Sequence, residues 1–128
     1  MKTILIVDDS TTMRRMIRAT LQTLENISFK EAENGLEAIE CLTLNSIDLM
    51  TLDLNMPDIN GLAVLNFINS HQTLKKIPII VITARSDEQT RDKVMAAGAT
   101  QFMKKPLEPQ KLLAHVERLL NTLFSEYS

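Results

Sequence analysis

The chain has 128 residues, the usual size of one domain, so we expect residues 1–128 to fold as a single unit. Its 14 Lys and Arg residues against 16 Asp and Glu residues give a net charge of −2, which argues against nucleic acid as a direct ligand. A single cysteine excludes an internal disulfide and is typical of a reducing compartment, so we expect the cytoplasm. No apolar run approaches the roughly 20 residues of a membrane span, and we expect neither a signal peptide nor a membrane anchor.

The first half of the chain alternates between strand and helix patterns. Residues 4–7 form a short, continuous apolar run typical of a strand buried on both faces, and residues 27–32 form a weaker one before the turn-forming pair Asn34-Gly35. Between these strands, apolar residues recur at spacings of three and four and predict a helix: Met13, Met16, Ile17, Leu21 and Leu24. Asn34, with Glu37 three residues later, predicts the start of a second helix.

The second half repeats this alternation. Nearly continuous apolar runs at residues 47–52 and 77–82 predict the third and fourth strands, and a weaker run at residues 99–103 predicts the fifth. Between the third and fourth strands, Asn60 is a suitable cap for a third helix. Five strands separated by helices result.

The last two helices are marked at their ends. Ser86 predicts the start of the fourth helix, and Gly98 its end. Pro109 predicts the first turn of the fifth helix. The apolar residues that this helix is expected to bury are Leu112, Leu113, Val116, Leu119, Leu120 and Leu123.

Strict alternation of strands and helices predicts an α/β fold: a doubly wound, five-stranded parallel sheet with helices on both faces, as a three-layer sandwich. Alternation alone does not determine the strand order. Five strands fit the flavodoxin-like order 2-1-3-4-5 better than the six-stranded dinucleotide-binding order, and no glycine-rich loop follows the first strand. In either order, ligands bind beyond the carboxyl ends of the strands.

Polar side chains follow four of the predicted strands. Asp8 and Asp9 follow the first strand, Asp53 the third, Thr83 the fourth and Lys105 the fifth. In the order 2-1-3-4-5 the first and third strands are neighbours, about 5 Å apart, so the three carboxylates are expected to converge. Clustered carboxylates repel one another, and a hard divalent cation with oxygen ligands relieves this repulsion. A shallow carboxylate site that keeps several waters suits magnesium.

Four short motifs, in the same order along the chain, carry a resemblance to a known family. They are Asp8-Asp9-Ser10, Asp53-Leu54-Asn55-Met56-Pro57 with Gly61, Thr83-Ala84, and Lys105-Pro106. Over essentially its whole length the sequence resembles the receiver domain of two-component response regulators. With no output domain attached, it is most similar to the stand-alone, CheY-like receivers.

The resemblance implies that Asp53 accepts a phosphoryl group from a histidine kinase or a histidine phosphotransfer protein. It also implies a Mg²⁺ site in which Asp9, Asp53 and the main-chain carbonyl of Asn55 are direct ligands and Asp8 helps through water. Such chemistry is reasonable on its own terms, because phosphoryl transfer depends mainly on positioning and charge neutralisation.

By the same resemblance, Lys105 pairs with one phosphoryl oxygen, Thr83 hydrogen-bonds another, and the Lys105-Pro106 peptide bond is cis. Thr83 and Phe102 are implied to form a switch. It changes the surface made by the fourth helix, the fifth strand and the fifth helix, through which a downstream protein binds. Chemotaxis-type receivers carry a tyrosine where this chain has Phe102, so a contact through a hydroxyl is lost.

Simpler roles for the same residues remain open: Asp9 or Ser10 as the cap of the first helix, Thr83 as a strand end, and Phe102 as a fixed core residue. Chemotaxis output, phosphorelay transfer and a phosphate sink are not separable from the sequence. Outside signalling, the alternatives are a magnesium-dependent phosphatase with an aspartate nucleophile and a flavin-binding module. The phosphatase is disfavoured because 128 residues leave no room for the cap that encloses a phosphatase substrate. We expect instead a monomeric signalling module with self-catalysed phosphotransfer and dephosphorylation.

Overall fold

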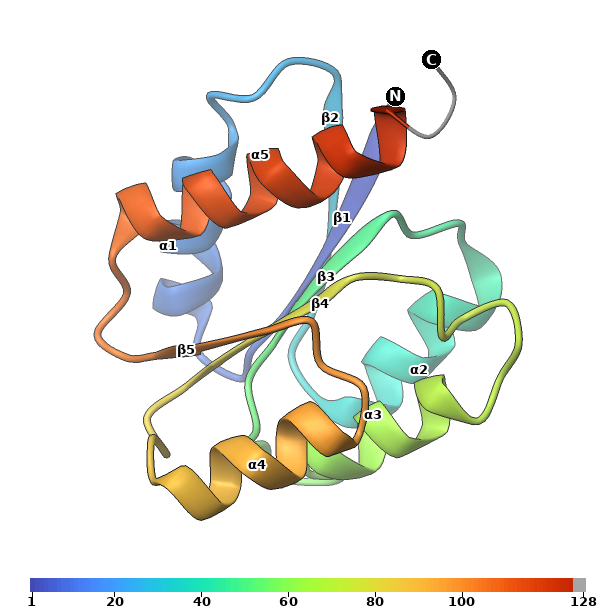
Figure 1. The fold of residues 1–128 in the computed structure, drawn as a ribbon, viewed down its shortest axis with the longest axis vertical. Coiled ribbons are helices and arrows are strands. Elements are labelled where there is room, and N and C mark those ends of the chain that lie inside the picture. The colour runs from blue at the N-terminus through green and yellow to red at the C-terminus, as the bar shows by residue number, and fades with distance from the viewer. Residues whose placement is uncertain (126–128) are drawn as a thin grey trace.

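Strands and helices alternate strictly along the described residues (Figure 1). The computed structural model describes the backbone of residues 1–125 and the side chains of residues 1–121. The strands are β1 (Lys2–Val7), β2 (Ile27–Ala32), β3 (Leu49–Leu52), β4 (Ile79–Thr83) and β5 (Gln101–Lys104). The helices are α1 (Thr11–Leu21), α2 (Gly35–Leu44), α3 (Gly61–Asn69), α4 (Glu88–Ala96) and α5 (Pro109–Ser125).

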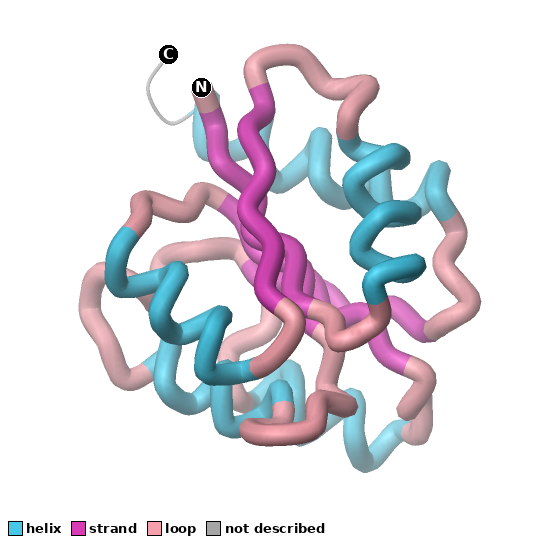
Figure 2. The backbone as a smooth tube through the Cα atoms, turned by 180° about the vertical axis from the view of Figure 1, so that it is seen from behind, coloured by secondary structure: helices cyan, strands magenta, loops and turns pink. Residues whose placement is uncertain are grey.

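The strands form one parallel sheet in the order β2-β1-β3-β4-β5. Helices α1 and α5 cover one face of this sheet, and α2, α3 and α4 cover the other (Figure 1). Figure 2 shows the same three layers from behind, with the strands in the middle. The predicted fold class and strand order are therefore confirmed. Because all the strands run in one direction, their carboxyl ends lie at a single edge of the sheet.

The core consists of two layers, one on each face of the sheet. Along β1, Leu5 and Val7 pack on the side of α2, α3 and α4, while Ile4 and Ile6 pack on the side of α1 and α5. All four side chains are essentially inaccessible to solvent. Burial on both faces explains why the central strands are almost entirely apolar and do not alternate between apolar and polar residues.

Two of the predicted helix caps are present and one is displaced. The side chains of Asn34 and Asn60 cap α2 and α3. Helix α4 is capped by Asp87, so the prediction of Ser86 was wrong by one residue. The Asp87 carboxylate accepts both the main-chain N–H and the hydroxyl of Thr90, at 3.0 and 2.7 Å. The main-chain N–H bonds to Oδ2 and the hydroxyl to Oδ1, so each donor of Thr90 has its own carboxylate oxygen.

The apolar stripe predicted for the first helix is only partly correct. Helix α1 ends at Leu21, so Leu24 lies beyond it, although Leu24 still packs against the core. Ile17 and Leu21 are buried, but the side chain of Met16 is 44% exposed. Met16 precedes Ile17 by one position, which on a helix turns its side chain away from the buried stripe.

Helix α5 begins at Pro109, as predicted. Its residues Leu112, Val116 and Leu120 are buried, and Leu113 and Leu119 are partly buried. The prediction that Leu123 is buried falls outside the described side chains. None of the described helices combines the length and the apolar character needed to cross a membrane.

One buried hydroxyl has no hydrogen-bond partner among the described residues. Thr51 is 1% exposed and lies between Ile6 of β1 and Ile80 of β4. We therefore expect Thr51→Val to raise the free energy of unfolding by about 1 kcal/mol, because valine keeps the shape and removes an unpaired polar group. Urea unfolding measures this. The control is Thr90→Val, which removes a hydroxyl bonded to Asp87 and should lower stability. A loss of stability for Thr51→Val as well would mean that its hydroxyl has a partner, such as a buried water.

Candidate functional site

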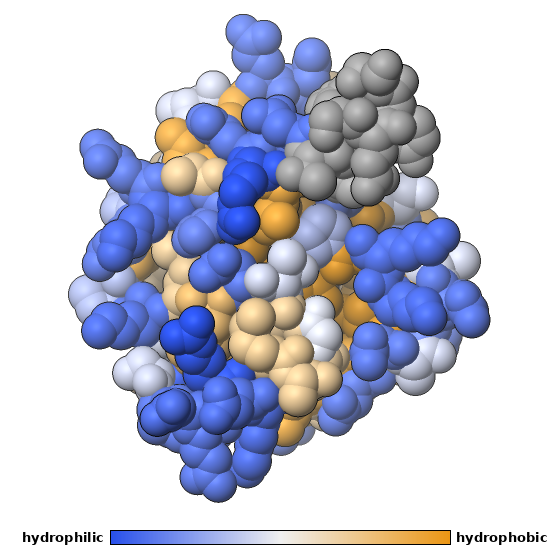
Figure 3. Space-filling model, viewed as in Figure 1, coloured by the Kyte–Doolittle hydropathy of each residue, from blue (hydrophilic) through white to orange (hydrophobic). Residues whose placement is uncertain are grey.

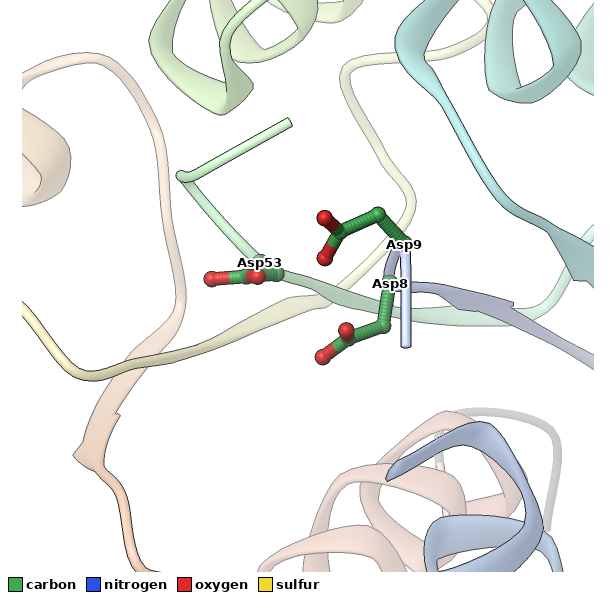
Figure 4. Close-up of side chains that lie close together, drawn as sticks. All are labelled: Asp8, Asp9 and Asp53. Carbon is green, nitrogen blue, oxygen red and sulfur yellow. The ribbon is translucent and has the colours of Figure 1, made fainter. Parts of the chain in front are cut away.

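Three carboxylates meet at the carboxyl edge of the sheet, where β1 and β3 end side by side (Figure 4). Asp8 extends the pairing of β1 by donating its main-chain N–H to the carbonyl of Ala32, and Asp53 extends β3 by donating to the carbonyl of Val7. Asp8 and Asp53 are 1% and 3% exposed, whereas Asp9 is exposed. One carboxylate oxygen of each residue lies within 4.8 Å of the other two. The structure thus brings together the three acids that the sequence placed at this edge.

An ammonium group adjoins the two buried carboxylates. The Nζ atom of Lys105 donates to Oδ2 of Asp8 at 3.0 Å and to Oδ2 of Asp53 at 3.4 Å. Lys105, which the sequence placed at the same edge of the sheet, thus contacts both buried carboxylates, and its shorter bond is made to Asp8. The peptide bond between Lys105 and Pro106 is cis, as expected. The main-chain N–H of Lys105 donates to the carbonyl of Thr83, which attaches this loop to the end of β4.

The charges of the site change the proton affinities of its groups. Burial raises the pKa of Asp53, and repulsion from Asp8 adds to this increase, while Lys105 and the N–H of Asn55 oppose it. Burial alone lowers the pKa of Lys105, but its hydrogen bond to Asp8 and the charges of Asp53 and Asp8 together outweigh burial and raise it. Lys105 is therefore a cation at neutral pH, and it partly compensates two carboxylates.

The other predicted site residues differ in burial and in their contacts. Asn55 is exposed, and its main-chain N–H donates to Oδ1 of Asp53 at 3.3 Å. Thr83 is completely buried, and its hydroxyl oxygen accepts the main-chain N–H of Arg85 at 3.2 Å. Phe102 lies within β5, partly buried against the core on the side of α4.

The loop after Asp53 is held by contacts that the sequence did not predict. Asp58 accepts the main-chain N–H groups of Gly35 and Leu36, at the start of α2, at 2.9 and 3.0 Å. Although desolvation opposes the effect, these bonds lower the pKa of Asp58. Gly61 packs so closely that an added Cβ would lie 2.6 Å from the carbonyl oxygen of Asp53. The usable sequence signals were an acidic residue in this loop and a glycine at the start of α3.

The donor chemistry of the cluster fits a hard divalent cation. Asp8, Asp9 and Asp53 offer carboxylate oxygens, the ligand type that Mg²⁺ prefers. Asp9 is exposed, so a bound cation there keeps contact with water, as Mg²⁺ usually does. The same cation would reduce the repulsion among the three carboxylates.

Comparisons with known proteins agree with the fold. A family model of the response regulator receiver domain matches residues 4–117. The chain belongs to the response regulator receiver family. This receiver domain is 39% identical to the chemotaxis protein CheY1 of Helicobacter pylori over 120 residues, which cover 93% of the chain and 97% of that protein. It is 36% identical to a chemotaxis protein CheY homolog of Campylobacter jejuni, with 93% and 92% covered.

The solved structure of the chemotaxis response regulator CheY4 of Vibrio cholerae has the same fold as this receiver domain. The two align with a TM-score of 0.84 at 29% identity, over 93% of this chain and 98% of CheY4. The motifs Asp8-Asp9, Asp53, Thr83 and Lys105-Pro106 therefore lie in a receiver domain, a signalling module of two-component systems. Receiver domains bind Mg²⁺ at an acidic pocket, and the cluster of Asp8, Asp9 and Asp53 is the acidic pocket of this one.

Proposed function

We propose that Asp53 accepts a phosphoryl group from the phosphohistidine of a histidine kinase or a histidine phosphotransfer protein. The observation that carries this proposal is the surroundings of its carboxylate, which lies beside two further carboxylates and 3.4 Å from the Lys105 ammonium. A carboxylate oxygen of Asp53 forms a bond to phosphorus as the phosphorus–nitrogen bond of phosphohistidine breaks. The imidazole nitrogen of the donor leaves with the electron pair of that bond, and with one proton taken up from water the donor becomes neutral histidine.

The neighbouring residues have separate roles in this transfer. Asp9, Asp53 and the main-chain carbonyl of Asn55 would hold Mg²⁺ directly, with Asp8 acting through water. When bound, the ion neutralises negative charge on the phosphoryl oxygens. Lys105 is placed by its bonds to Asp8 and Asp53 to pair with a phosphoryl oxygen. The same groups support self-catalysed transfer from small phosphodonors and later hydrolysis.

Phosphorylation from a small donor tests this function. Incubated with acetyl phosphate and magnesium, the protein should gain one phosphoryl group by intact mass, as acetate leaves and an acyl phosphate forms on Asp53. Because acyl phosphates are labile, hydroxylamine should remove the added mass. No added mass, or a mass that resists hydroxylamine, would contradict the proposal.

Magnesium should stabilise the folded state by mass action. At a magnesium concentration ten times the Kd, the free energy of unfolding should rise by about 1.4 kcal/mol. Asp9→Ala removes one carboxylate of the cluster and should reduce this gain, whereas Asp92→Ala, an exposed acid of α4, should leave it unchanged. Urea unfolding in magnesium and in EDTA gives the comparison. An equal gain for Asp9→Ala and the parent would locate the ion elsewhere.

The output surface that we propose is the face of α4, β5 and α5. A hollow of about 290 Å³ on this face is lined by Phe102 and Met103, by the cationic side chains of Arg91, Lys104 and Lys111, and by Glu108, which pairs with Lys111 at 2.9 Å. Figure 3 shows apolar surface over α4 and β5 among hydrophilic side chains. This mixture suits a downstream protein segment with apolar and acidic side chains.

Thr83 and Phe102 are proposed to connect Asp53 with this face. Thr83 ends β4, and Phe102 faces Val81 of the same strand from β5. A phosphoryl oxygen on Asp53 offers the Thr83 hydroxyl a charged acceptor, and movement of Thr83 changes the space open to the Phe102 ring. Because Phe102 has no hydroxyl, its buried orientation leaves no polar group unpaired. The change is a shift between two existing populations.

A chemotaxis role is supported by the two CheY relatives, and phosphorelay transfer and a phosphate sink are the competing outputs. We infer that residues 1–128 act as one monomeric domain in the cytoplasm.

Affinity capture with beryllofluoride-loaded protein distinguishes direct chemotaxis output from phosphorelay transfer and a phosphate sink. Capture of a motor or effector protein supports direct output, and capture of histidine phosphotransfer proteins alone supports a relay or sink.

A further inference from the structure

The guanidinium of Arg14 binds the main chain at Asp8, at the start of the loop between β1 and α1. Arg14 belongs to the first turns of α1, and its side chain is only 12% exposed. Its Nη1 donates to the main-chain carbonyl of Asp8 at 2.7 Å, and its Nε donates to Oε1 of Glu31 at 3.0 Å. Its Nη2 donates to the hydroxyl of Thr11 at 3.3 Å. A long cationic side chain is thus fixed at three points.

The partner of Arg14 is itself held in place. Glu31 lies in β2, opposite Ile6 of β1, and its second carboxylate oxygen accepts from Nη1 of Arg18 at 2.9 Å. The Arg18 guanidinium lies over the ring of Phe29, 5.3 Å from its centroid. The Arg14 guanidinium is therefore anchored to a strand of the sheet and can restrain the loop after β1.

The Asp8 carbonyl that Arg14 binds belongs to the peptide unit joining Asp8 to Asp9. Other bonds already fix Asp8: its N–H pairs with Ala32, and its carboxylate accepts from the N–H of Ser10 and from Lys105. Asp9 is exposed and is repelled by two buried carboxylates. The orientation of the Asp8–Asp9 peptide determines the direction of the Asp9 side chain. A charged donor at 2.7 Å strongly restrains that orientation.

We propose that Arg14 is a positioning residue of the magnesium site, holding the Asp8–Asp9 peptide so that Asp9 stays beside Asp53 before the cation binds. This inference rests on the metal site of the proposed function. A positioning role and a purely electrostatic effect of Arg14 predict opposite changes in Mg²⁺ affinity when its charge is removed. A cation close to the pocket opposes Mg²⁺ binding by its charge, so its removal would tighten binding if charge alone mattered. Glu31 is shared between Arg14 and Arg18 and offsets only part of their charge, so the direction of the change in Kd on removing Arg14 distinguishes restraint from charge.

The test measures the Kd for Mg²⁺ by isothermal titration calorimetry at a temperature where urea unfolding shows every variant to be folded. Arg14→Met, which keeps the aliphatic stem, should weaken binding about tenfold. Arg15→Met removes the same charge from the neighbouring, exposed position and should leave the Kd within about twofold of the parent. Arg14→Lys keeps the charge without the planar fork, and should also bind more weakly than the parent.

A second readout needs no metal. The N–H of Ser10 donates to the Asp8 carboxylate, so its hydrogen exchange in EDTA reports the order of the loop. Exchange should be faster in Arg14→Met than in the parent and unchanged in Arg15→Met. If the parent binds Mg²⁺ and Arg14→Met binds it equally or more tightly, the positioning role of Arg14 is wrong and the metal site still stands. A parent protein that binds no Mg²⁺ would overturn the metal site of the proposed function and this inference with it.

Discussion

Asp53→Asn is expected to gain no phosphoryl group from acetyl phosphate and magnesium, and in EDTA at neutral pH to be more stable than the parent. The first result follows because the amide has no nucleophilic carboxylate oxygen. The second follows because the structure holds the Asp53 carboxylate 3% exposed and near a second buried carboxylate. The neutral amide has nearly the same shape and removes that unfavourable charge.

The pH dependence of the stability difference follows from the raised pKa of Asp53. When the folded pKa of an acid exceeds its unfolded value, here 3.8, the folded state holds the proton more tightly. Stability therefore falls as pH rises through the window between the two values. Above that window the penalty is fully present, so the free energy of unfolding of Asp53→Asn should exceed that of the parent at pH 7, within the about 0.5–3 kcal/mol by which single substitutions usually change stability. The difference should shrink as pH falls through the window toward 3.8.

The matched control is Asp9→Asn, which makes the same chemical change at the exposed member of the cluster. Its stability in EDTA should change less than that of Asp53→Asn, because an exposed carboxylate keeps its hydration. Intact mass spectrometry and urea unfolding at several pH values provide both readouts. Phosphorylation of Asp53→Asn to the parent level would show that the acceptor is another residue. A lower stability of Asp53→Asn at pH 7 would show that attraction to Lys105 exceeds the cost of burial.

The order of the secondary structure elements was predictable because strands buried on both faces and helices buried on one face leave different patterns. The exact bounds were not, and several strand ends differ by up to two residues. Ile47 illustrates the reason: it is buried, yet it precedes Leu49, the first residue of β3 paired with β1. Hydropathy reports burial, whereas the start of a strand depends on pairing with its neighbour.

The meeting of Asp8, Asp9 and Asp53 was predictable because strand order alone brings the ends of β1 and β3 together. The contacts that hold these residues were only partly predictable, because the sequence placed Lys105 at this edge without determining its partners. Lys105 is 97 residues from Asp8, and its reach depends on the path of the loop after β5. The bond from Arg14 to the Asp8 carbonyl involves a main-chain acceptor, and no pattern of side chains encodes such a partner.

Lys105→Met is expected to destabilise the protein in EDTA and to strengthen magnesium binding. The ammonium is the cation bonded to both Asp8 and Asp53, and Asp8 is almost completely buried. Removing it leaves two buried carboxylates without that partner, which should lower the free energy of unfolding by about 1–3 kcal/mol. The raised pKa of Lys105 keeps this stabilisation present throughout the neutral range. It is lost only as pH rises above 10.5 through the folded value.

The same ammonium lies where it opposes an incoming divalent cation. A unit charge a few Å away contributes on the order of 1 kcal/mol or more, so Lys105→Met should bind Mg²⁺ about tenfold more tightly than the parent. Lys104→Met is the matched control, because Lys104 is adjacent, exposed and of equal charge. Titration calorimetry and urea unfolding in magnesium and EDTA should show little change for this control.

The response to a bound phosphoryl mimic separates the structural role of Lys105 from its signalling role. With magnesium present to support the fold, Lys105→Met should still take up a phosphoryl group at Asp53, because the nucleophile and the acidic pocket are intact. It should not relay the event, since the bond between the ammonium and a phosphoryl oxygen is absent. In the parent, beryllofluoride should shift the NMR signals of Thr83 and Phe102, and in Lys105→Met these shifts should be reduced at least severalfold. Equal shifts in both proteins would mean that the change reaches Phe102 through Thr83 alone, and that Lys105 serves only to balance the charge of Asp8 and Asp53.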